Sequence, residues 1–289
     1  MNELSLKAHG KINLGLDVLG RREDGYHLVR MIMQTVSVHD RVKLQKKDTN
    51  DITMSCDDAA LPTGDDNLCI KAAKLLFDAY HLSGGLDISL EKRIPVAAGM
   101  AGGSTDAAAV LKGINTLYDL GLSVEQLQKH GLTLGADIPY CIMGGTALSE
   151  GIGEVLSPLS PMPQTPLLIA KPKIGVSTGA IYKALDSLES YEHPDIDGLI
   201  AAISAGDLEL LCQKMGNVLA YVTEPMVPEI EKIRKIMMEN GATGAMMTGS
   251  GPTVFGLFES ETVMHACADV LSKTGLCETV IPGYTKETS

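Results

Sequence analysis

A glycine-rich stretch, PVAAGMAGGST at residues 95–105, has the composition of a loop that holds an anion. Its three glycines allow a ligand to approach the backbone closely, and its serine and threonine add hydroxyl groups. The helical run DAAAVLKGI follows directly. Because the first amides of a helix have no partner and carry the positive end of the helix dipole, the stretch predicts a phosphate site. The alternative is a tight structural turn in which Ser104 caps the helix.

Two single residues also lie where chemistry is possible. Lys11 interrupts the strand-like run AHGKINLGL, and Asp137 precedes Ile-Pro in LGADIPY. A second glycine-rich turn, TGSGPTVFG at 248–256, lies between two apolar runs. Taken singly, Lys11 is explained as a lysine at a strand edge, Asp137 as a turn residue, and the second glycine-rich turn as a β-hairpin or bulge. Their order and spacing together favour a site in which a carboxylate, an ammonium group and a phosphate meet.

Other nucleotide sites and several protein classes are disfavoured. The chain has neither the GxxxxGK[ST] pattern of a P-loop nor a GxGxxG after its first strand, which argues against a nicotinamide dehydrogenase. A net charge of −12 argues against a nucleic-acid binder. Six scattered cysteines without a CxxC pair indicate reduced thiols, not disulfides or zinc.

The location of the chain follows from its apolar pattern. No apolar run approaches the ~20 residues that span a bilayer. Lys7 and Lys11 interrupt the first 20 residues, so these lack the pattern of a signal peptide. We therefore expect a cytoplasmic protein that acts on a small molecule, with neither nucleic acid nor membrane as partner.

Alternating and helical patterns predict the elements that position these residues. The first half reads as strands joined by a hairpin with an Asp-Gly turn, then helices that flank one further strand. The expected strands are 4–20, 28–45, 51–56 and 86–94, and the expected helices are 67–80, 104–119 and 122–131.

Four prolines within residues 158–166 predict a boundary between two parts, 1–160 and 161–289. Beyond it the patterns indicate strands at 167–171, 242–249, 252–258 and 278–283, with helices near 177–186, 195–204, 227–239 and 261–273. The β-β-α-β order of the last four elements is typical of an α+β fold.

Taken together, the motifs resemble the GHMP small-molecule kinase superfamily over nearly the whole chain. The runs that carry the resemblance are KINLGLDVLGRREDGYH, PVAAGMAGGSTDAAA, LGADIPY and MTGSGPTVFG. GRREDGYH and LGADIP are similar to one branch, whose acceptor is an alcohol linked to cytidine diphosphate. Two departures stand out: Ala101 replaces the first of three consecutive glycines, and Ala8-His9-Gly10 replaces the usual Ala-Pro-Ala. Ala101 retains its amide.

The resemblance implies a fold and an activity. The fold would be two-lobed α+β, with an ATP-binding lobe at 1–160 that contains a left-handed β-α-β crossover and a ferredoxin-like lobe at 161–289. The activity would be the ATP-dependent phosphorylation of the 2-hydroxyl of a methylerythritol unit, in the non-mevalonate route to isoprenoids. ATP and Mg²⁺ would be required.

The resemblance also implies roles for residues at the nucleotide end. Asp137 would take the proton of the attacking hydroxyl, and Lys11 beside it would keep Asp137 ionised and stabilise developing charge. Asp106 would be either a magnesium ligand or a helix-start carboxylate favoured by the dipole. The ATP phosphates would lie on Pro95, Val96, Ala97, Ala98, Gly99, Met100, Ala101, Gly102, Gly103, Ser104 and Thr105, and the adenine near Asn67, Leu68 and Lys92.

At the acceptor end, the resemblance implies that Tyr26 stacks on the cytosine and His27 hydrogen-bonds its polar edge. Tyr182 would cover the other face, unless it is only a buried helix tyrosine. Asn13 would hydrogen-bond the substrate. A kinase for another alcohol, such as mevalonate or homoserine, would keep the loop but lack DGYH. A non-catalytic anion-binding protein would lose the Lys–Asp pair.

Overall fold

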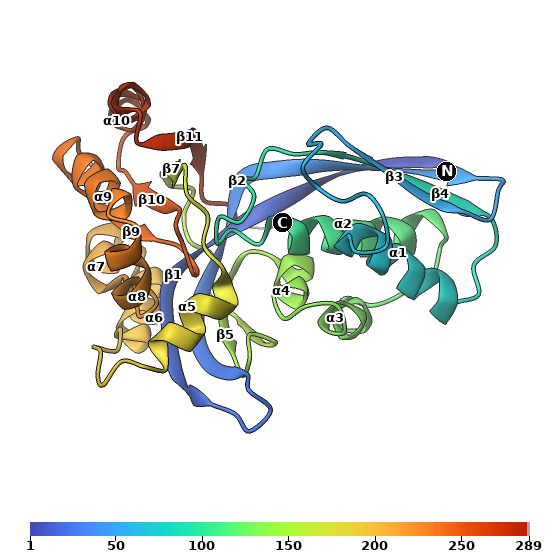
Figure 1. Cartoon of the computed structure of the whole chain (residues 1–289), viewed down its shortest axis with the longest axis horizontal. Coiled ribbons are helices and arrows are strands. Elements are labelled where there is room, and N and C mark those ends of the chain that lie inside the picture. Colours follow the sequence, from blue (N-terminus) through green and yellow to red (C-terminus); the bar gives the residue numbers. More distant parts are fainter. Residues whose placement is uncertain (288–289) are drawn as a thin grey trace.

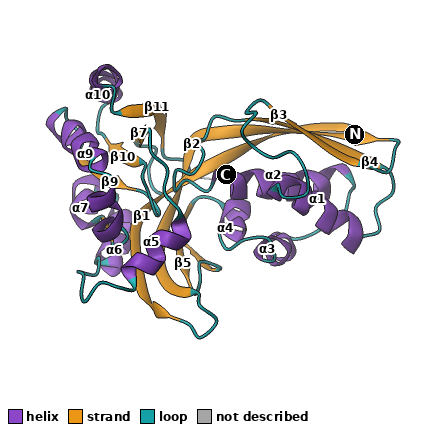
Figure 2. Ribbon diagram, in the orientation of Figure 1, coloured by secondary structure: helices purple, strands orange, loops and turns teal. Residues whose placement is uncertain are grey.

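Two β-sheets lie side by side with helices on their outer faces, as the computed structural model of the chain shows (Figures 1 and 2). The structure describes residues 1–287. The first sheet is mixed and seven-stranded, and the second is antiparallel and four-stranded. The α+β class predicted from the element patterns is therefore confirmed.

The first sheet is built on one long hairpin, which crosses most of the molecule (Figure 1). The strands run in the order β3-β4-β2-β1-β8, and β5 pairs with both β2 and β6. Their bounds are β1 (Glu3–Arg21), β2 (His27–Lys47), β3 (Ile52–Cys56), β4 (Gly85–Glu91), β5 (Thr146–Glu150), β6 (Val155–Pro158) and β8 (Gly216–Asn217).

The register of β1 against β2 slips next to Lys11. His9 pairs with His39, yet Lys11 pairs with Thr35, so a β-bulge separates these pairs. A bulge bends a strand and re-aims its side chains. Lys11 consequently has its side chain buried at the centre of the molecule although it belongs to a sheet strand.

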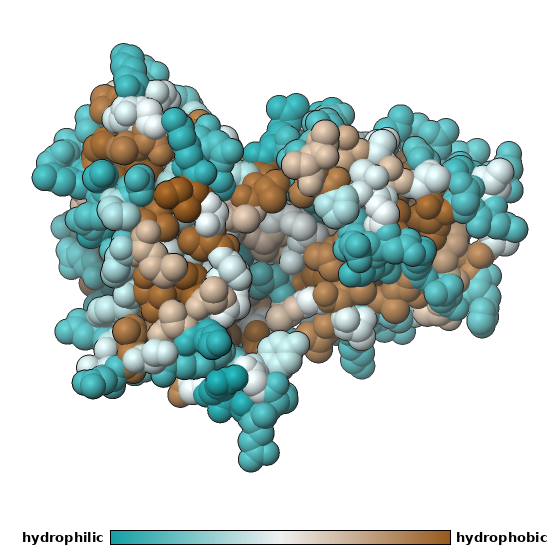
Figure 3. Space-filling model, in the orientation of Figure 1, coloured by the Kyte–Doolittle hydropathy of each residue, from teal (hydrophilic) through white to brown (hydrophobic). Residues whose placement is uncertain are grey.

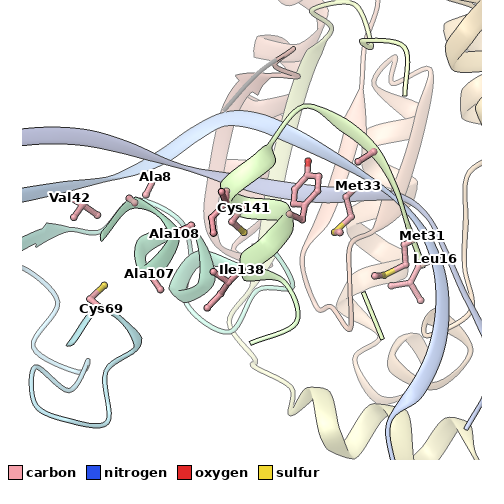
Figure 4. Packing of buried hydrophobic residues seen from close by; sticks show 14 of the residues in the cluster. Ala8, Leu16, Met31, Met33, Val42, Cys69, Ala107, Ala108, Ile138 and Cys141 are labelled. Atoms are coloured by element: carbon pink, nitrogen blue, oxygen red, sulfur yellow. The ribbon is translucent and has the colours of Figure 1, made fainter. Parts of the chain in front are cut away.

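Helices cover one face of the first sheet. They are α1 (Leu68–Ala79), α2 (Gly102–Leu117), α3 (Val124–Leu132) and α4 (Ile138–Met143). The parallel strands β3 and β4 are joined through α1 as a β-α-β unit. Alanine, the best helix former, also lets α2 approach its neighbours closely. Figure 4 shows Ala107 and Ala108 of α2 beside Ile138 and Cys141 of α4.

The second sheet has the strand order β11-β7-β10-β9, which is that of a ferredoxin-like fold and agrees with the prediction. Its strands are β7 (Pro166–Pro172), β9 (Gly244–Met247), β10 (Val254–Leu257) and β11 (Cys277–Tyr284). Helices α9 and α10 pack on it, and the others precede them in the chain. The bounds are α5 (Thr178–Leu185), α6 (Ile196–Ala205), α7 (Leu208–Lys214), α8 (Ala220–Met226), α9 (Glu229–Glu239) and α10 (Glu261–Thr274).

The two sheets share a hydrophobic core. Side chains alternate along β7, so Leu167 and Ile169 pack with Leu14 of β1, while Leu168 and Ala170 face the opposite cluster. The short strand β8 also pairs with β1. Because elements from both sides of the proline run are packed together, the division at residue 160 stays a prediction.

Several short elements were not predicted. Helices α4, α7 and α8 have six or seven residues each, and β8 has two, which is too short for a periodic pattern to emerge. Strands β5 and β6 were also missed. The predicted start of α2 was wrong by two residues, because the helix begins at Gly102, within the glycine run, and not at Ser104.

Candidate active site

A cavity of about 1030 Å³ opens between the start of α2 and helix α5. Figure 3 shows this face of the molecule hollowed between the two halves. Every predicted site residue lines the cavity except Met100 and Thr105, which are buried behind it. The Met100 carbonyl accepts the amide of Lys11 at 3.2 Å, and the Thr105 hydroxyl donates to the His9 carbonyl at 2.7 Å. These two residues hold the turn on β1.

The turn before α2 winds through left-handed backbone. Ala97, Gly99 and Ala101 have φ values of 51°, 70° and 58°. A Cβ atom on Gly99 would lie 2.3 Å from the carbonyl oxygen of Thr248, so only glycine fits there. The turn therefore rests directly on the second glycine-rich turn, 248–252.

The first amides of α2 are free to bind an anion. Ala101 is the N-cap residue and supplies no side-chain hydrogen bond. The amides of Gly102, Gly103 and Ser104 have no partner within residues 1–287. Ser104 lies inside the first helical turn, so the alternative in which it caps the helix is wrong. The start of α2, for which the sequence suggested a serine cap, therefore has no capping side chain and lines the cavity.

Lys11 is fixed at the floor of the cavity. Its side chain is 5% exposed, and its ammonium donates to Asn13 Oδ1 at 2.7 Å and to the Gly99 carbonyl at 2.9 Å. Burial lowers the pKa of Lys11, and the nearby charge of Asp137 opposes that change. The fully buried Asn13 thus positions Lys11, and its amide donates to Thr248 Oγ1 at 3.0 Å.

Asp137 lies at the start of α4 and presents a free carboxylate. It is the N-cap residue but caps no amide with its side chain, and its carboxylate accepts no hydrogen bond from the described residues, whereas its backbone carbonyl accepts the amide of Cys141 at 3.1 Å. Its charge acts on both Lys11 and Tyr182, which come from opposite halves of the chain. Lys11 and Asp137 both line the cavity, and they form no ion pair with each other within residues 1–287.

Lys92 lies in a buried carboxylate cluster. Its ammonium bonds Asp40 and lies 2.7 Å from Asp106 Oδ2. Burial opposes ionisation of Lys92, but the two carboxylates outweigh it and its pKa is raised. Burial raises the pKa of Asp106 to about 8; Lys92 opposes this rise, and Asp40 adds to it. One ammonium does not neutralise two buried carboxylates, so Asp106 tends to retain its proton.

This cluster does not fit the expected magnesium ligand. One oxygen of Asp106 is held by Lys92, and the other, Oδ1, is buried without a hydrogen bond. A protonated, enclosed carboxyl group is a poor ligand for Mg²⁺, which takes charged or solvated oxygens. The helix-start alternative does not fit either, because the first turn of α2 holds no acidic residue and Asp106, the fifth residue of the helix, pairs with Lys92.

The remaining residues expected near the adenine lie at the start of α1. Asn67 caps that helix, because its side chain accepts the amide of Cys69 at 2.8 Å and donates to the Pro62 carbonyl at 2.7 Å. Leu68 follows as the first helical residue. Asn67 and Leu68 line the cavity beside the start of α2.

The other end of the cavity is aromatic. His27 of β2 and Tyr182 of α5 lie with ring centroids 4.9 Å apart, and Tyr26 is 58% exposed beside them. His27 Nε2 lies 2.7 Å from Asp186 Oδ1, and Arg21 lies 3.3 Å from the other oxygen of Asp186. Tyr182 packs against the hydrophobic core and also lines the cavity, so both alternatives for this residue stay predictions.

Several residues that shape the site were missed in the sequence. Asp40 and Asp186 lie 52 and 159 residues from their partners Lys92 and His27, so no local pattern joins them. An acidic residue within the apolar strand pattern VSVHDRVKL was a usable signal for Asp40. For Asp186 there was none. Thr248 and Ser250 belonged to a motif that was noted without a role; Ser250 Oγ lies 2.9 Å from Thr178 Oγ1.

Comparison with known proteins decides the family. Residues 67–145 match the sequence model of the GHMP kinases N terminal domain, and residues 199–275 match that of the GHMP kinases C terminal. A protein of Lachnospira eligens named 4-diphosphocytidyl-2-C-methyl-D-erythritol kinase is 50% identical over 100% of this chain and 99% of its own. A protein of Lachnoclostridium phytofermentans with the same name is 51% identical over 90% of each chain. The chain belongs to the 4-diphosphocytidyl-2-C-methyl-D-erythritol kinase family of GHMP kinases.

Solved structures agree. A crystal structure of 4-(cytidine 5'-diphospho)-2C-methyl-D-erythritol kinase matches with a TM-score of 0.84 and 32% identity, over 98% of this chain and 99% of that one. A homoserine kinase from Cytophaga hutchinsonii matches with a TM-score of 0.77 but 18% identity, over 100% of this chain and 96% of that one, which speaks for the fold alone.

As a GHMP kinase, the chain is a small-molecule phosphotransferase with ATP as the phosphoryl donor. No helix within residues 1–287 is long and apolar enough to cross a bilayer.

Proposed function

We propose that the chain transfers the γ-phosphoryl group of ATP to the 2-hydroxyl of 4-diphosphocytidyl-2-C-methyl-D-erythritol, in the non-mevalonate route to isoprenoids. The single observation that carries this proposal is the cavity, in which free helix amides, the Lys11 and Asp137 side chains, and an aromatic end lie together. The names of the full-length relatives support the same acceptor. Small-molecule kinases need alignment and charge neutralisation more than covalent help.

The triphosphate would lie against the start of α2. The unpaired amides of Gly102, Gly103 and Ser104 are fixed donors that point to one place, and the helix dipole favours negative charge there. Left-handed backbone at Ala101 turns the chain into the helix without a capping side chain. The amide donors of this site are therefore already in position before an anion binds.

The transfer itself would take place between Lys11 and Asp137. The acceptor oxygen forms a bond to the γ-phosphorus, the bond from that phosphorus to the β–γ bridging oxygen breaks, and the hydroxyl proton passes to Asp137. Lys11 stays protonated and stabilises the charge that builds on the transferred group. Its hydrogen bonds to Asn13 and to the Gly99 carbonyl fix the ammonium, so little reorganisation accompanies the reaction.

The cytosine would lie at the aromatic end. Tyr26 is exposed and free to stack on a base, and Tyr182 is held in place by α5. His27 Nε2 faces the carboxylate of Asp186, so this nitrogen carries a proton. We infer that Asp186 positions His27 toward the base and fixes its tautomer.

Magnesium and location complete the proposal. Mg²⁺ would arrive bound to the ATP phosphates, where it would neutralise charge during transfer, and we assign it no ligand in this chain. We place the protein in the cytoplasm because all six cysteines are free thiols, which suits a reducing compartment.

One experiment tests the function directly. The protein is incubated with ATP and, separately, with the cytidine diphosphate alcohol, mevalonate and homoserine, and products are followed by phosphorus NMR. A new phosphomonoester resonance with the cytidine compound alone is expected. A phosphomonoester from mevalonate or homoserine at equal or higher rate, or none from the cytidine compound, overturns the proposal.

A further inference from the structure

A second cavity of about 590 Å³ is lined in part by β8 and β9. Its walls come from the connection between α5 and α6, the end of α7, and helices α8 and α9. No step of the proposed reaction uses these residues. A cavity of this volume falls within the range that holds small organic ligands.

The floor of this second cavity is shaped by close packing. A Cβ atom on Gly244 of β9 would lie 2.6 Å from Cys212 Cβ, and one on Gly216 of β8 would lie 2.8 Å from Pro194 Cβ. The cavity therefore lies over tightly packed backbone. Methionine, cysteine and tyrosine side chains make up much of the wall, namely Met215, Met238, Met246, Cys212 and Tyr221. Thioethers adapt to varied apolar shapes and contact aromatic rings favourably.

The charged side chains that line this cavity differ in whether they have partners. Its three basic side chains each have a partner, namely Lys214 with Asp195 at 2.6 Å, His193 with Asp17 at 2.7 Å and Arg234 with Glu231, although Arg234 Nε is buried without a hydrogen bond. Glu224 on α8 has no hydrogen bond or ion pair within residues 1–287, although it is half-buried. Burial raises the pKa of Glu224, against the pull of Arg234. Arg234 is thus near Glu224 but forms no ion pair with it, so the carboxylate can still pair with a cation that enters the cavity.

Asn217 connects the second cavity with the active site. Asn217 lines the second cavity and is buried, and its Nδ2 donates to the carbonyls of Met247 and Gly249 at 3.0 and 2.8 Å. Gly249 lines the active-site cavity. Asn217 also pairs with Leu16 through β8, and Leu16 lines the active-site cavity too. A ligand against Asn217 would thus act on backbone that borders the nucleotide site.

We propose that this second cavity binds a small organic cation, an amine on an aromatic or aliphatic body, and that its occupancy is coupled to ATP binding through Asn217. The ammonium group would pair with Glu224, and the apolar body would lie on the methionine wall. Coupling between two sites is reciprocal, so ATP and the amine must change each other's affinity by the same factor.

The probe is 2-phenylethylamine, with the neutral 2-phenylethanol as its matched control. Methyl-labelled methionine gives separate reporters, because Met246 lines the second cavity and Met31 lines the active site. The amine is expected to shift the Met246 methyl resonance with a dissociation constant of about 1 mM, and the alcohol to bind at least tenfold more weakly. No shift at Met246 up to about tenfold that concentration, a shift at Met31 alone, or equal binding of the alcohol overturns the proposal.

Variants locate the charge. Glu224→Gln keeps shape and removes the carboxylate, so the affinity for the amine should fall at least tenfold. Glu209→Gln, an exposed glutamate on α7 outside the lining, should change it less than twofold. Loss in both variants, or in neither, refutes the role of Glu224. These readings need no turnover, so they stand apart from the proposed kinase activity.

The coupling is measured on the unmodified protein. The dissociation constant of a non-hydrolysable ATP analogue is determined with and without saturating amine, and that of the amine with and without the analogue. Both ratios should be equal and at least twofold, and Glu224→Gln should abolish the effect of the amine. Ratios of one would show that the cavity binds amines without reaching the active site, which overturns the coupling.

Discussion

The two ends of the active-site cavity are built from different parts of the chain. At the start of α2 the useful groups are backbone amides, presented by left-handed residues and by Gly99 packed against Thr248. At the other end they are side chains, namely His27 of β2, Tyr182 of α5 and Asp186 at the C-cap of α5.

That difference separates what depends on fold from what depends on sequence. Amides keep their positions as long as the backbone keeps its path, so many sequences can preserve an end made of amides. An end made of side chains changes with a single substitution. We therefore expect the phosphate end to respond mainly to blocking or backbone changes, and the aromatic end to respond to loss of individual side chains.

The largest effect on this comparison should come from blocking the amides. A Cβ atom on Gly103 would meet only Leu68 Cδ1, at 3.7 Å, so Gly103→Val should fold while its side chain enters the phosphate end. Affinity for ATP should fall about 10–100-fold, because the anion loses its close approach to the backbone. Titration calorimetry checks this.

Gly64→Val is the control for Gly103→Val, since nothing lies within 4 Å of the added Cβ and the position lies outside the lining. Gly102 is a less clean choice, because its Cβ would also press on Ile94 at 3.2 Å. Unchanged ATP affinity in a folded Gly103→Val protein would mean that the glycine turn is only structural.

A smaller and more selective effect is expected at the aromatic end. Asp186→Asn removes the charge that faces His27 Nε2 and allows the amide to present its N–H group instead. The KM for the cytidine substrate should rise about tenfold, the usual scale for a lost charged hydrogen bond, while the KM for ATP and kcat stay close to normal. Asp51→Asn, which loses a pair with Lys47 at the other end of β2 and outside the lining, should leave all three constants unchanged. Equal changes in both KM values would refute the selective role of Asp186.

Asp106→Asn should have a small effect on activity and a visible effect on the pH profile of stability. Because its folded pKa of about 8 lies above the ordinary value of 3.8, Asp106 stabilises the fold in full below pH 3.8. That contribution is lost as the pH rises through 8. The variant should remove this loss in thermal unfolding between pH 6 and 9 and keep turnover within about threefold. A hundredfold loss that high Mg²⁺ restores would instead make Asp106 a metal ligand.

The smallest effect should be a gain in stability at Ala101. A left-handed conformation costs an L-residue about 1–2 kcal/mol, and glycine gives back part of that as unfolded-chain entropy. Ala101→Gly should therefore stabilise the fold by about 0.5–1 kcal/mol and change ATP affinity less than twofold, because the amide remains. Ala108→Gly, in the buried middle of α2, should destabilise by about 1 kcal/mol in the same denaturant titration. Destabilisation by Ala101→Gly would contradict this explanation of the turn.

Much of the fold could be predicted from sequence because its long elements carry clear periods. The hairpin of β1 and β2 alternates over many residues, and α1, α2, α9 and α10 keep helical spacing. The bulge beside Lys11 and the short elements α4 and β8 could not be predicted, because each depends on packing against segments that are distant in the sequence.

The candidate site divides in the same way. Motifs that are continuous in sequence, such as the turn at 95–105, were found because their spacing is local. Asp186 and Asn217 were missed because their partners lie 159 and 32 residues away, and a lone aspartate or asparagine has no pattern of its own. The hydrogen bonds that Lys11 donates to Asn13 and to the Gly99 carbonyl were likewise not predicted, although Lys11 itself was identified as a candidate.

The central claim is that the two ends meet at Asp137, with Lys11 opposite. The direct measurement is the single-turnover rate of Asp137→Asn with ATP and the cytidine substrate bound, beside separate titrations of both ligands. Both affinities should stay within about threefold, while the rate falls about 10²–10⁴-fold, and Lys11→Met should lose a comparable factor. The double variant should lose far less than the product of the two. A near-normal rate in Asp137→Asn would contradict the account.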